Sequence, residues 1–222
     1  MLSKELRNLT LRRYYLDNRL AKCNYYGQVL DIGGKKINKR GLFHPPTNNV
    51  ESWQYVNIDM STNPDYLCPA DAIDVQDMSF DIVILTEVLE HLENPEKVLQ
   101  EAYRILKKHG KIIISMPFLY PIHGDPDDFQ RWTPSKIKQV LRQNNFLIDS
   151  LEPMGGLFSV YYDLLRTATG MASKNRKAIK NRILMKFIFP FLAQLAKKLD
   201  RHFEYKMFWI TTGYFVVGIK SE

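Results

Sequence analysis

The amino-acid sequence predicts an α/β fold built on a mostly parallel sheet, and three neighbouring segments carry this prediction. Phe80–Leu85 is apolar except for Asp81, which is typical of a strand buried on both faces of a parallel sheet. Pro95 begins an amphipathic helix, and Lys111–Met116 returns as a second buried run. A strand, a crossover helix and a further strand in this order form the repeating unit of parallel sheets.

The segments before this unit supply the first helix and the first strands. Residues 3–24 are predicted to be helical, with apolar positions at Leu6, Leu9, Tyr14, Leu16 and Leu20 among charged residues. Gln28–Ile32 is predicted as a buried strand that ends at two glycines, and Gln54–Ile58 as a second strand that ends before Asp59. The interval from Asp59 to Asp71 is too short for a crossover helix plus a strand, so we expect a loop and a short third strand there.

The helix that begins at Pro95 has apolar residues at helical spacing, at Val98, Leu99, Ala102, Ile105 and Leu106. We expect Lys107 and Lys108 to lie in its last turn and Gly110 to end it. The strand Lys111–Met116 would then follow directly.

The C-terminal part is predicted to contain one more helix, two strands and a helical insertion. Thr133–Asn145 reads as a helix with Thr133 as its N-cap. Phe146–Glu152 and Phe208–Lys220 read as the last two strands. Residues 156–170 and 176–202, which lie between them, both look helical.

The net charge of +7 comes from one region of the chain. Between Asp163 and Asp200 there is no acidic residue, whereas there are nine basic ones, namely Arg166, Lys174, Arg176, Lys177, Lys180, Arg182, Lys186, Lys197 and Lys198. The rest of the chain is slightly acidic. This distribution disfavours a protein that coats nucleic acid and favours a local anionic partner. The two cysteines, Cys23 and Cys68, lack metal-ligand spacing, and we expect them to be free thiols.

The acidic segment TEVLEHL, which follows Phe80–Leu85, resembles the centre of class I S-adenosylmethionine-dependent methyltransferases of the type 11 kind. The resemblance extends well from Gln28 to about Thr133 and more loosely to the final strand. It implies a Rossmann-like, seven-stranded, mostly parallel sheet with an antiparallel last strand and a helical insertion before it. It also implies S-adenosyl-L-methionine as the cofactor.

The same resemblance implies a set of cofactor-binding residues, which are Asp31, Gly33, Gly34, Asp59, Asp71, Ala72, Thr86, Glu87 and His91. Asp59 would accept hydrogen bonds from the two ribose hydroxyls, and Asp71 would accept one from the adenine amine. Thr86 and Glu87 would line the methionine end of the pocket. Lys35 and Lys36 stand where the family often has further glycines, and GxGxxG is absent, which argues against an ordinary dinucleotide fold.

A second cluster of polar residues, FLYPIHGDPDDFQRWTP, follows the fifth strand at 118–134. It resembles a subgroup of methyltransferases associated with bacterial surface sugars and other glycan pathways, whose pattern is H-x-x-P-x-D-[FY]-x-R-[FW]-T. We expect His123 to be the catalytic base, since imidazole titrates near neutral pH, with His91 as the alternative. Asp128 and Arg131 are candidate catalytic residues that could instead form a salt bridge that fixes the loop.

These features predict a methyltransferase that acts on an oxygen, less favourably a nitrogen, of a sugar or a lipid-linked small molecule. We expect no metal ion, because the leaving group of the cofactor is already activated. The alternative is a non-catalytic module of the same fold that scaffolds a membrane-associated assembly. Methylation of RNA or protein is disfavoured, because no NPPY-like motif follows the fourth strand.

We expect a single domain over 1–222, with an N-terminal helix (1–27), a cofactor-binding core (28–152), a basic helical insertion (153–205) and a final strand (206–222). The insertion could pack on the domain, bind an anionic membrane surface through residues 174–199, or, least favourably, bind nucleic acid. For the membrane, the apolar side would consist of Ile183, Leu184, Phe187, Ile188, Phe191 and Leu192. We expect a cytoplasmic protein, and the alternative is a peripheral position at the inner face of the membrane. Its apolar stretch 183–196 is too short to span a bilayer.

Overall fold

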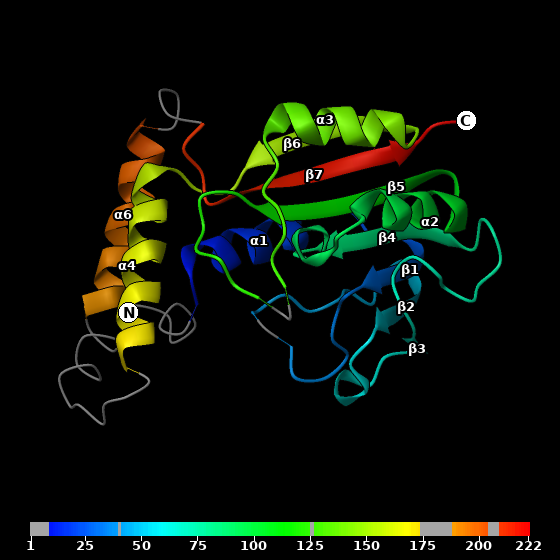
Figure 1. Ribbon diagram of the computed structural model, residues 1–222, viewed down its shortest axis with the longest axis horizontal. Coiled ribbons are helices and arrows are strands. Elements are labelled where there is room, and N and C mark those ends of the chain that lie inside the picture. The colour runs from blue at the N-terminus through cyan, green and yellow to red at the C-terminus, as the bar shows by residue number, and fades with distance from the viewer. Residues whose placement is uncertain (1–8, 40, 125–126, 174–187, 204–208) are drawn as a thin grey trace.

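The computed structural model describes residues 9–39, 41–124, 127–173, 188–203 and 209–222, and these residues form a sheet with helices on both faces (Figure 1). The sheet has seven strands in the order β3-β2-β1-β4-β5-β7-β6. The strands are β1 (Gly27–Ile32), β2 (Val50–Asn57), β3 (Tyr66–Leu67), β4 (Phe80–Thr86), β5 (Leu106–Pro117), β6 (Phe146–Pro153) and β7 (Gly213–Lys220). β7 lies antiparallel between β5 and β6, whereas the other pairs are parallel. The expected α/β class I methyltransferase fold is confirmed.

The described helices are α1 (Leu11–Lys22), α2 (Pro95–Ile105), α3 (Pro134–Gln143), α4 (Leu157–Ser173) and α6 (Phe189–Phe203), with short 3-10 turns η2 (Met60–Thr62) and η3 (Leu89–His91). The first helix lies within its predicted range, of which residues 3–8 fall outside the described part of the chain. Thr10 and Thr133 cap α1 and α3 by accepting from backbone N–H groups in the first turn.

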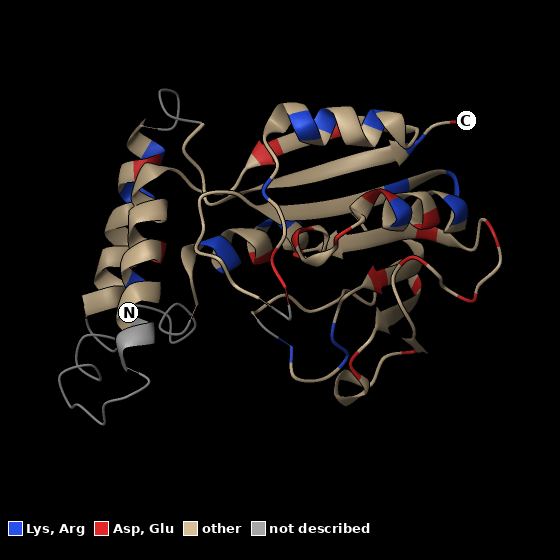
Figure 2. Ribbon diagram, viewed as in Figure 1, with Lys and Arg blue, Asp and Glu red and all other residues tan. Residues whose placement is uncertain are grey.

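Two hydrophobic clusters, one on each face of the sheet, explain why the central strands are mainly apolar. On one face, Val83 and Leu85 of β4 pack with Val98 and Leu99 of α2. On the other face, Ile82 and Ile84 pack with Leu16 of α1. Because successive side chains of a strand point to opposite faces, both sets must be apolar. Figure 2 shows the contrast, since the central strands are almost wholly tan and α2 and α3 carry the charged side chains.

Several predicted boundaries were wrong, and that of the final strand is one of them, because the described residues 209–212 are not in a strand and β7 begins at Gly213. The helix after Pro95 ends at Ile105, and Lys107 and Lys108 belong to β5 instead of the last helical turn. The reason is that buried Leu106 pairs with Phe80 at the start of β4, which begins the strand before Gly110 is reached. The second strand also begins earlier than predicted, at Val50, because this segment pairs with the start of β1.

The expected helical insertion is present between β6 and β7 and lies at one end of the sheet, where α4 and α6 pack side by side (Figure 1). Asp200 of α6 accepts hydrogen bonds from the backbone N–H groups of Gly156 (2.9 Å) and Phe158 (2.9 Å) at the start of α4. Asp163 of α4 accepts from the N–H groups of Leu11 (2.7 Å) and Arg12 (2.9 Å) in the first turn of α1. Both carboxylates satisfy helix N-termini: Asp200 joins the two helices of the insertion, and Asp163 attaches the insertion to α1. The predicted helical range 176–187 and the strand residue Phe208 lie outside the described residues.

Candidate active site

A cavity of about 1080 Å³ opens at the carboxyl ends of β1, β2 and β4. This is the edge at which open α/β sheets bind their ligands. Among the predicted site residues, the cavity is lined by Asp31, Gly33, Gly34, Asp59, Asp71, Thr86, Glu87, His91 and His123. Ala72 is exposed and is absent from this lining, as are Asp128 and Arg131.

The turn after β1 needs glycine at Gly33. Its φ is +78°, and a Cβ at this position would lie 2.5 Å from Cγ2 of Val88. Any side chain would therefore strain the backbone and collide with the segment after β4. Asn57 at the end of β2 holds the turn from the other side, because its Nδ2 donates to the carbonyl of Gly34 (2.9 Å).

Asp31 lies beneath this turn, with its Oδ1 buried. Burial raises the pKa of Asp31 to about 7, while the positive charges of Lys39 and Arg13 act in the opposite direction. The carboxyl group supports the glycine turn from below and lines the cavity floor.

Asp59 lies on the open rim of the cavity, directly after β2. Its Oδ1 accepts from the N–H of Ser61 (2.9 Å), and this hydrogen bonding lowers the pKa of the carboxyl group. The N–H of Asp59 donates to Oδ1 of Asn57 (2.9 Å), so the residue that holds the glycine turn also positions Asp59. The carboxylate is fixed, ionised and exposed, as an acid that binds vicinal hydroxyls must be.

Glu87 follows β4 with a φ of +58° and accepts from Oγ of Ser115 (2.9 Å). Its other oxygen contacts the guanidinium of Arg12, which also lies 3.9 Å above the ring centroid of Tyr120. Burial lowers the pKa of Arg12, although Tyr120, Glu90 and Asp163 oppose this effect. The first helix thus places a guanidinium at the carboxyl end of β4.

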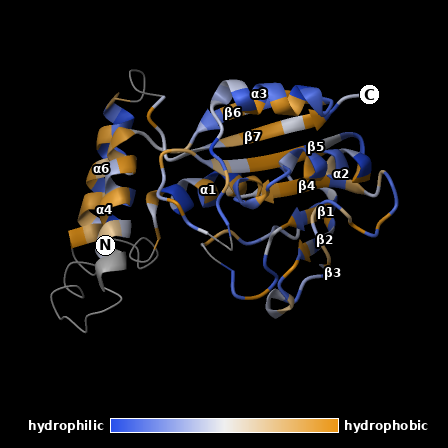
Figure 3. Ribbon diagram, in the orientation of Figure 1, coloured by the Kyte–Doolittle hydropathy of each residue, from blue (hydrophilic) through white to orange (hydrophobic). Residues whose placement is uncertain are grey.

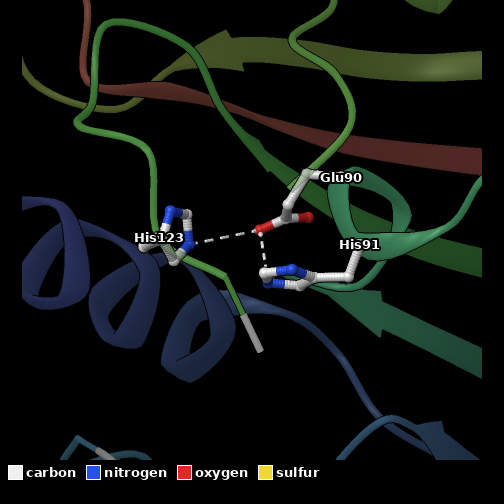
Figure 4. A group of neighbouring side chains, drawn as sticks. All are labelled: Glu90, His91 and His123. Carbon is white, nitrogen blue, oxygen red and sulfur yellow. Dashed lines mark ion pairs between the residues drawn. The ribbon is translucent and has the colours of Figure 1, made fainter. Parts of the chain in front are cut away.

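Glu90, His91 and His123 come together at the same end of the sheet (Figure 4). Oε1 of Glu90 lies 3.7 Å from Nε2 of His91 and 3.8 Å from Nε2 of His123. His91 lies on the 3-10 turn η3, ahead of α2, which starts at Pro95. Burial and the charge of Arg12 lower the pKa of His123 to about 4, so this ring is neutral at pH 7.

The predicted pairing of Asp128 with Arg131 is present, with Nη2 of Arg131 2.7 Å from Oδ2 of Asp128. Asp128 also accepts from the N–H of His123 (2.8 Å). Arg131 lowers the pKa of Asp128 to about 2. The pair therefore fixes the backbone that carries His123. Two residues of this loop, 125 and 126, lie outside the described part of the chain.

Sequence reasoning missed three residues of this site. Arg12 is far from the other site residues in the chain, and no motif surrounds it. Glu90 was noted in the acidic segment without a role, and Asn57 looked like an ordinary strand residue. The acid–histidine pair between two leucines in LEHL is the signal that could have identified Glu90.

The residues present fit S-adenosylmethionine. The cavity is large enough for a molecule of this size. The glycine turn allows close backbone approach, and the exposed Asp59 can accept from two hydroxyls.

Among the described helices, none has the length and apolar character needed to cross a bilayer.

Comparison with known proteins agrees with this description. Residues 41–114, about a third of the chain, match a family model described as a methyltransferase domain. A 41-residue segment is 49% identical to the uncharacterized protein MJ1123 of Methanocaldococcus jannaschii, which covers 18% of this chain and 20% of that protein. The matched segment thus spans about a fifth of this relative.

Two solved structures illustrate the likeness of fold. Phosphoethanolamine N-methyltransferase 2 of Haemonchus contortus, bound to S-adenosylhomocysteine, aligns with a TM-score of 0.53 and 16% identity over 95% of this chain and 53% of that one. The 1,6-didemethyltoxoflavin-N1-methyltransferase of Burkholderia thailandensis is also bound to S-adenosylhomocysteine. It aligns with a TM-score of 0.53 and 11% identity over 99% of this chain and 80% of that one. The two structures share the fold of this chain, and the methyltransferase family model matches about a third of it.

Proposed function

We propose that the protein transfers a methyl group from S-adenosylmethionine to an oxygen of a sugar or a lipid-linked small molecule. The observation that carries this proposal is that one cavity is lined both by the glycine turn with Asp59 and by His91 and His123. A cofactor held by the first group would share the cavity with an acceptor next to the histidines.

Each cofactor-side residue then has a role that its position allows. The backbone at Gly33 and Gly34 would approach the cofactor closely, and Asp59 would accept from the ribose hydroxyls. Asp71 on the cavity wall would accept from the adenine amine, with Ala72 beside it. Thr86 and Glu87 would contact the methionine part, near His91.

When bound, S-adenosylmethionine supplies a methyl group that is already activated by its sulfonium centre. The protein must then align the acceptor and remove its proton. His123 lines the cavity with a neutral ring, so its Nε2 can take the proton of an acceptor hydroxyl. Glu90, 3.8 Å away, would stabilise the imidazolium that forms. Asp128 and Arg131 hold the loop in place.

The acceptor class follows from the loop at 118–134, whose full pattern resembles methyltransferases of glycan pathways. The experiment is a transfer assay with S-adenosylmethionine labelled in its methyl group, offered free sugars, lipid-linked sugars and small amines. We expect label in a sugar or lipid-linked acceptor. The variant His123→Ala should lower kcat by roughly 10²–10⁴-fold, whereas the exposed His109→Ala should not. Transfer only to amines would reject the acceptor class.

We further infer that the insertion binds an anionic membrane surface at the cytoplasmic face. On α4 and α6 several apolar side chains are exposed, namely Tyr161, Leu165, Phe191 and Leu195, as is Ile188 directly before α6. Figure 3 shows hydrophobic residues along α4 and α6. The basic run Lys174–Lys186 of the predicted membrane segment, together with Phe187, lies outside the described residues. Basic and apolar side chains in one segment suit an anionic bilayer surface.

The alternative, a non-catalytic scaffold of the same fold, predicts a different outcome for Asp59→Ala. An enzyme should lose cofactor affinity and activity in this variant, whereas a scaffold should keep its function. The fixed and exposed carboxylate of Asp59 favours the enzyme.

A further inference from the structure

The cluster of Glu90, His91 and His123 has a feature that proton transfer alone does not explain. Neither carboxylate oxygen of Glu90 accepts a hydrogen bond from another residue in the described ranges, although the side chain is fully buried. A buried carboxylate without a donor is costly, because its negative charge has lost its hydration. Burial raises the pKa of Glu90, and either a proton or a cation between the three side chains would remove this cost.

Hydrogen bonds on the far side of each imidazole fix where the ring protons lie. Nδ1 of His91 is 2.5 Å from the carbonyl oxygen of Asp127, which can only accept. Nδ1 of His123 faces the carbonyl oxygen of Pro121 (3.2 Å) and Oδ2 of Asp128 (3.3 Å), which also accept. Each neutral ring therefore has its proton on Nδ1 and a lone pair on Nε2.

Both of these lone pairs face the same carboxylate oxygen, at 3.7 Å for His91 and 3.8 Å for His123. These separations are too long for hydrogen bonds. Two atoms that bind a common ion at about 2.1 Å lie roughly 3–4 Å apart. The three ligand atoms lie within 4.8 Å of one another, so a contraction of roughly 1 Å brings all of them onto one ion.

The charges around the cluster leave room for a cation. Arg12 is paired with Glu87, and Arg131 is paired with Asp128. Both guanidinium charges act on Glu90 and favour its ionised form, but within the described residues neither donates a hydrogen bond to its carboxylate. The carbonyl and carboxylate partners on Nδ1 are the outer-shell acceptors that usually orient metal-binding histidines.

We propose that Glu90, His91 and His123 bind a divalent transition-metal ion, with Zn²⁺ as the ion best suited to two imidazoles and one carboxylate. The sequence led to the expectation of no metal ion, because the leaving group of the cofactor is already activated. Since both histidines line the cavity, the remaining coordination position faces the space assigned to the acceptor. A site with three protein ligands and one open position is typical of catalytic zinc.

The role of this ion rests on the proposed function, whereas its binding does not. An acceptor hydroxyl bound at the open position would give its proton to solvent water more readily, because the ion would stabilise the alkoxide. In the metal-bound form Nε2 of His123 is a ligand and no longer the base. The ion and the imidazole are thus two ways of activating the same oxygen.

The experiment measures metal binding to the full chain without cofactor or acceptor, so it is independent of methyl transfer. Protein stripped with a chelator is titrated with ZnCl₂ in a calorimeter and with CoCl₂ in a spectrophotometer. The variants are Glu90→Gln and His123→Ala, and the control is His109→Ala, whose imidazole is exposed at the turn of β5. Circular dichroism shows whether each variant is folded. If Glu90→Gln does not fold, the His123→Ala variant tests the proposal, because His123 is partly exposed and its loss is less disruptive to folding.

We expect the wild type and His109→Ala to bind a single Zn²⁺ per chain, and Co²⁺ to give the visible absorption of a four- or five-coordinate site. Loss of a direct ligand should weaken Zn²⁺ binding by at least about tenfold, since loss of an outer-shell partner already costs this much. The proposal is overturned if folded His123→Ala binds Zn²⁺ as tightly as the wild type. It is also overturned if Co²⁺ gives only the spectrum of the hydrated ion.

Discussion

The guanidinium of Arg12 contacts the carboxylate of Glu87 and thereby joins the first helix to the loop after β4. Both side chains are mostly buried, with exposed fractions of 11% and 16%. Because Asp163 holds the first turn of α1, this contact connects the helical insertion with the wall of the cavity.

The Arg12–Glu87 pair should matter for stability. Arg12→Met leaves the buried carboxylate of Glu87 without its counter-charge, and we expect a loss of about 3 kcal/mol in the free energy of unfolding. The control is Lys36→Met, which breaks the exposed pair with Asp65 and should cost no more than about 1 kcal/mol. Urea denaturation of both variants measures the difference. Equal losses would show that burial does not strengthen the Arg12 contact.

Asp163 should make stability depend on pH. Burial raises its pKa to about 6, from 3.8 in the unfolded chain. The folded state therefore binds more protons between these values, and the contribution of this group is fully present below pH 3.8 and is lost as pH rises through 6. In Asp163→Asn this dependence should be absent. The stability difference between wild type and variant should thus fall by about 3 kcal/mol from acidic to neutral pH. A difference that is constant with pH would contradict the assignment.

Gly33→Ala should destabilise the turn after β1 by about 1–3 kcal/mol, because the left-handed backbone and the contact with Val88 both oppose a side chain. The double variant Gly33→Ala/Val88→Ala removes the collision and retains the backbone strain, so it separates the two causes. Thermal unfolding measured by circular dichroism provides the comparison. Full stability in the single variant would mean that the turn does not require glycine.

Vesicle binding should depend on the insertion. Replacing Lys177, Lys180 and Arg182 by Gln should reduce sedimentation with vesicles that contain anionic phosphatidylglycerol, and Phe191→Ser should do so through its exposed ring. Neutral phosphatidylcholine vesicles are the control and should bind little of either form. Equal sedimentation of the wild type and both variants would exclude the membrane role.

The sheet was predictable from the sequence because buried parallel strands need apolar residues on both faces, and Phe80–Leu85 satisfies this directly. The end of α2 was not predictable, since Leu106 has the same apolar spacing whether it ends a helix or begins a strand. Only its pairing with Phe80 decides between them.

The candidate site was predictable where a residue follows a strand, as Asp59 and Glu87 do. The position of Arg12 depends on how α1 packs across the sheet, and no local pattern encodes this packing. The meeting of Glu90 with His123 depends in the same way on the fold of a loop more than thirty residues later in the chain.

The most direct measurement is calorimetry of S-adenosylmethionine and S-adenosylhomocysteine binding to the wild type and to Asp59→Ala. We predict that the wild type binds both ligands and that the variant binds them at least roughly tenfold more weakly, because the ribose hydroxyls lose a charged acceptor. The exposed Asp149→Ala, on β6, should match the wild type. A folded wild-type protein that binds neither ligand would contradict the assignment of the cavity as a cofactor site.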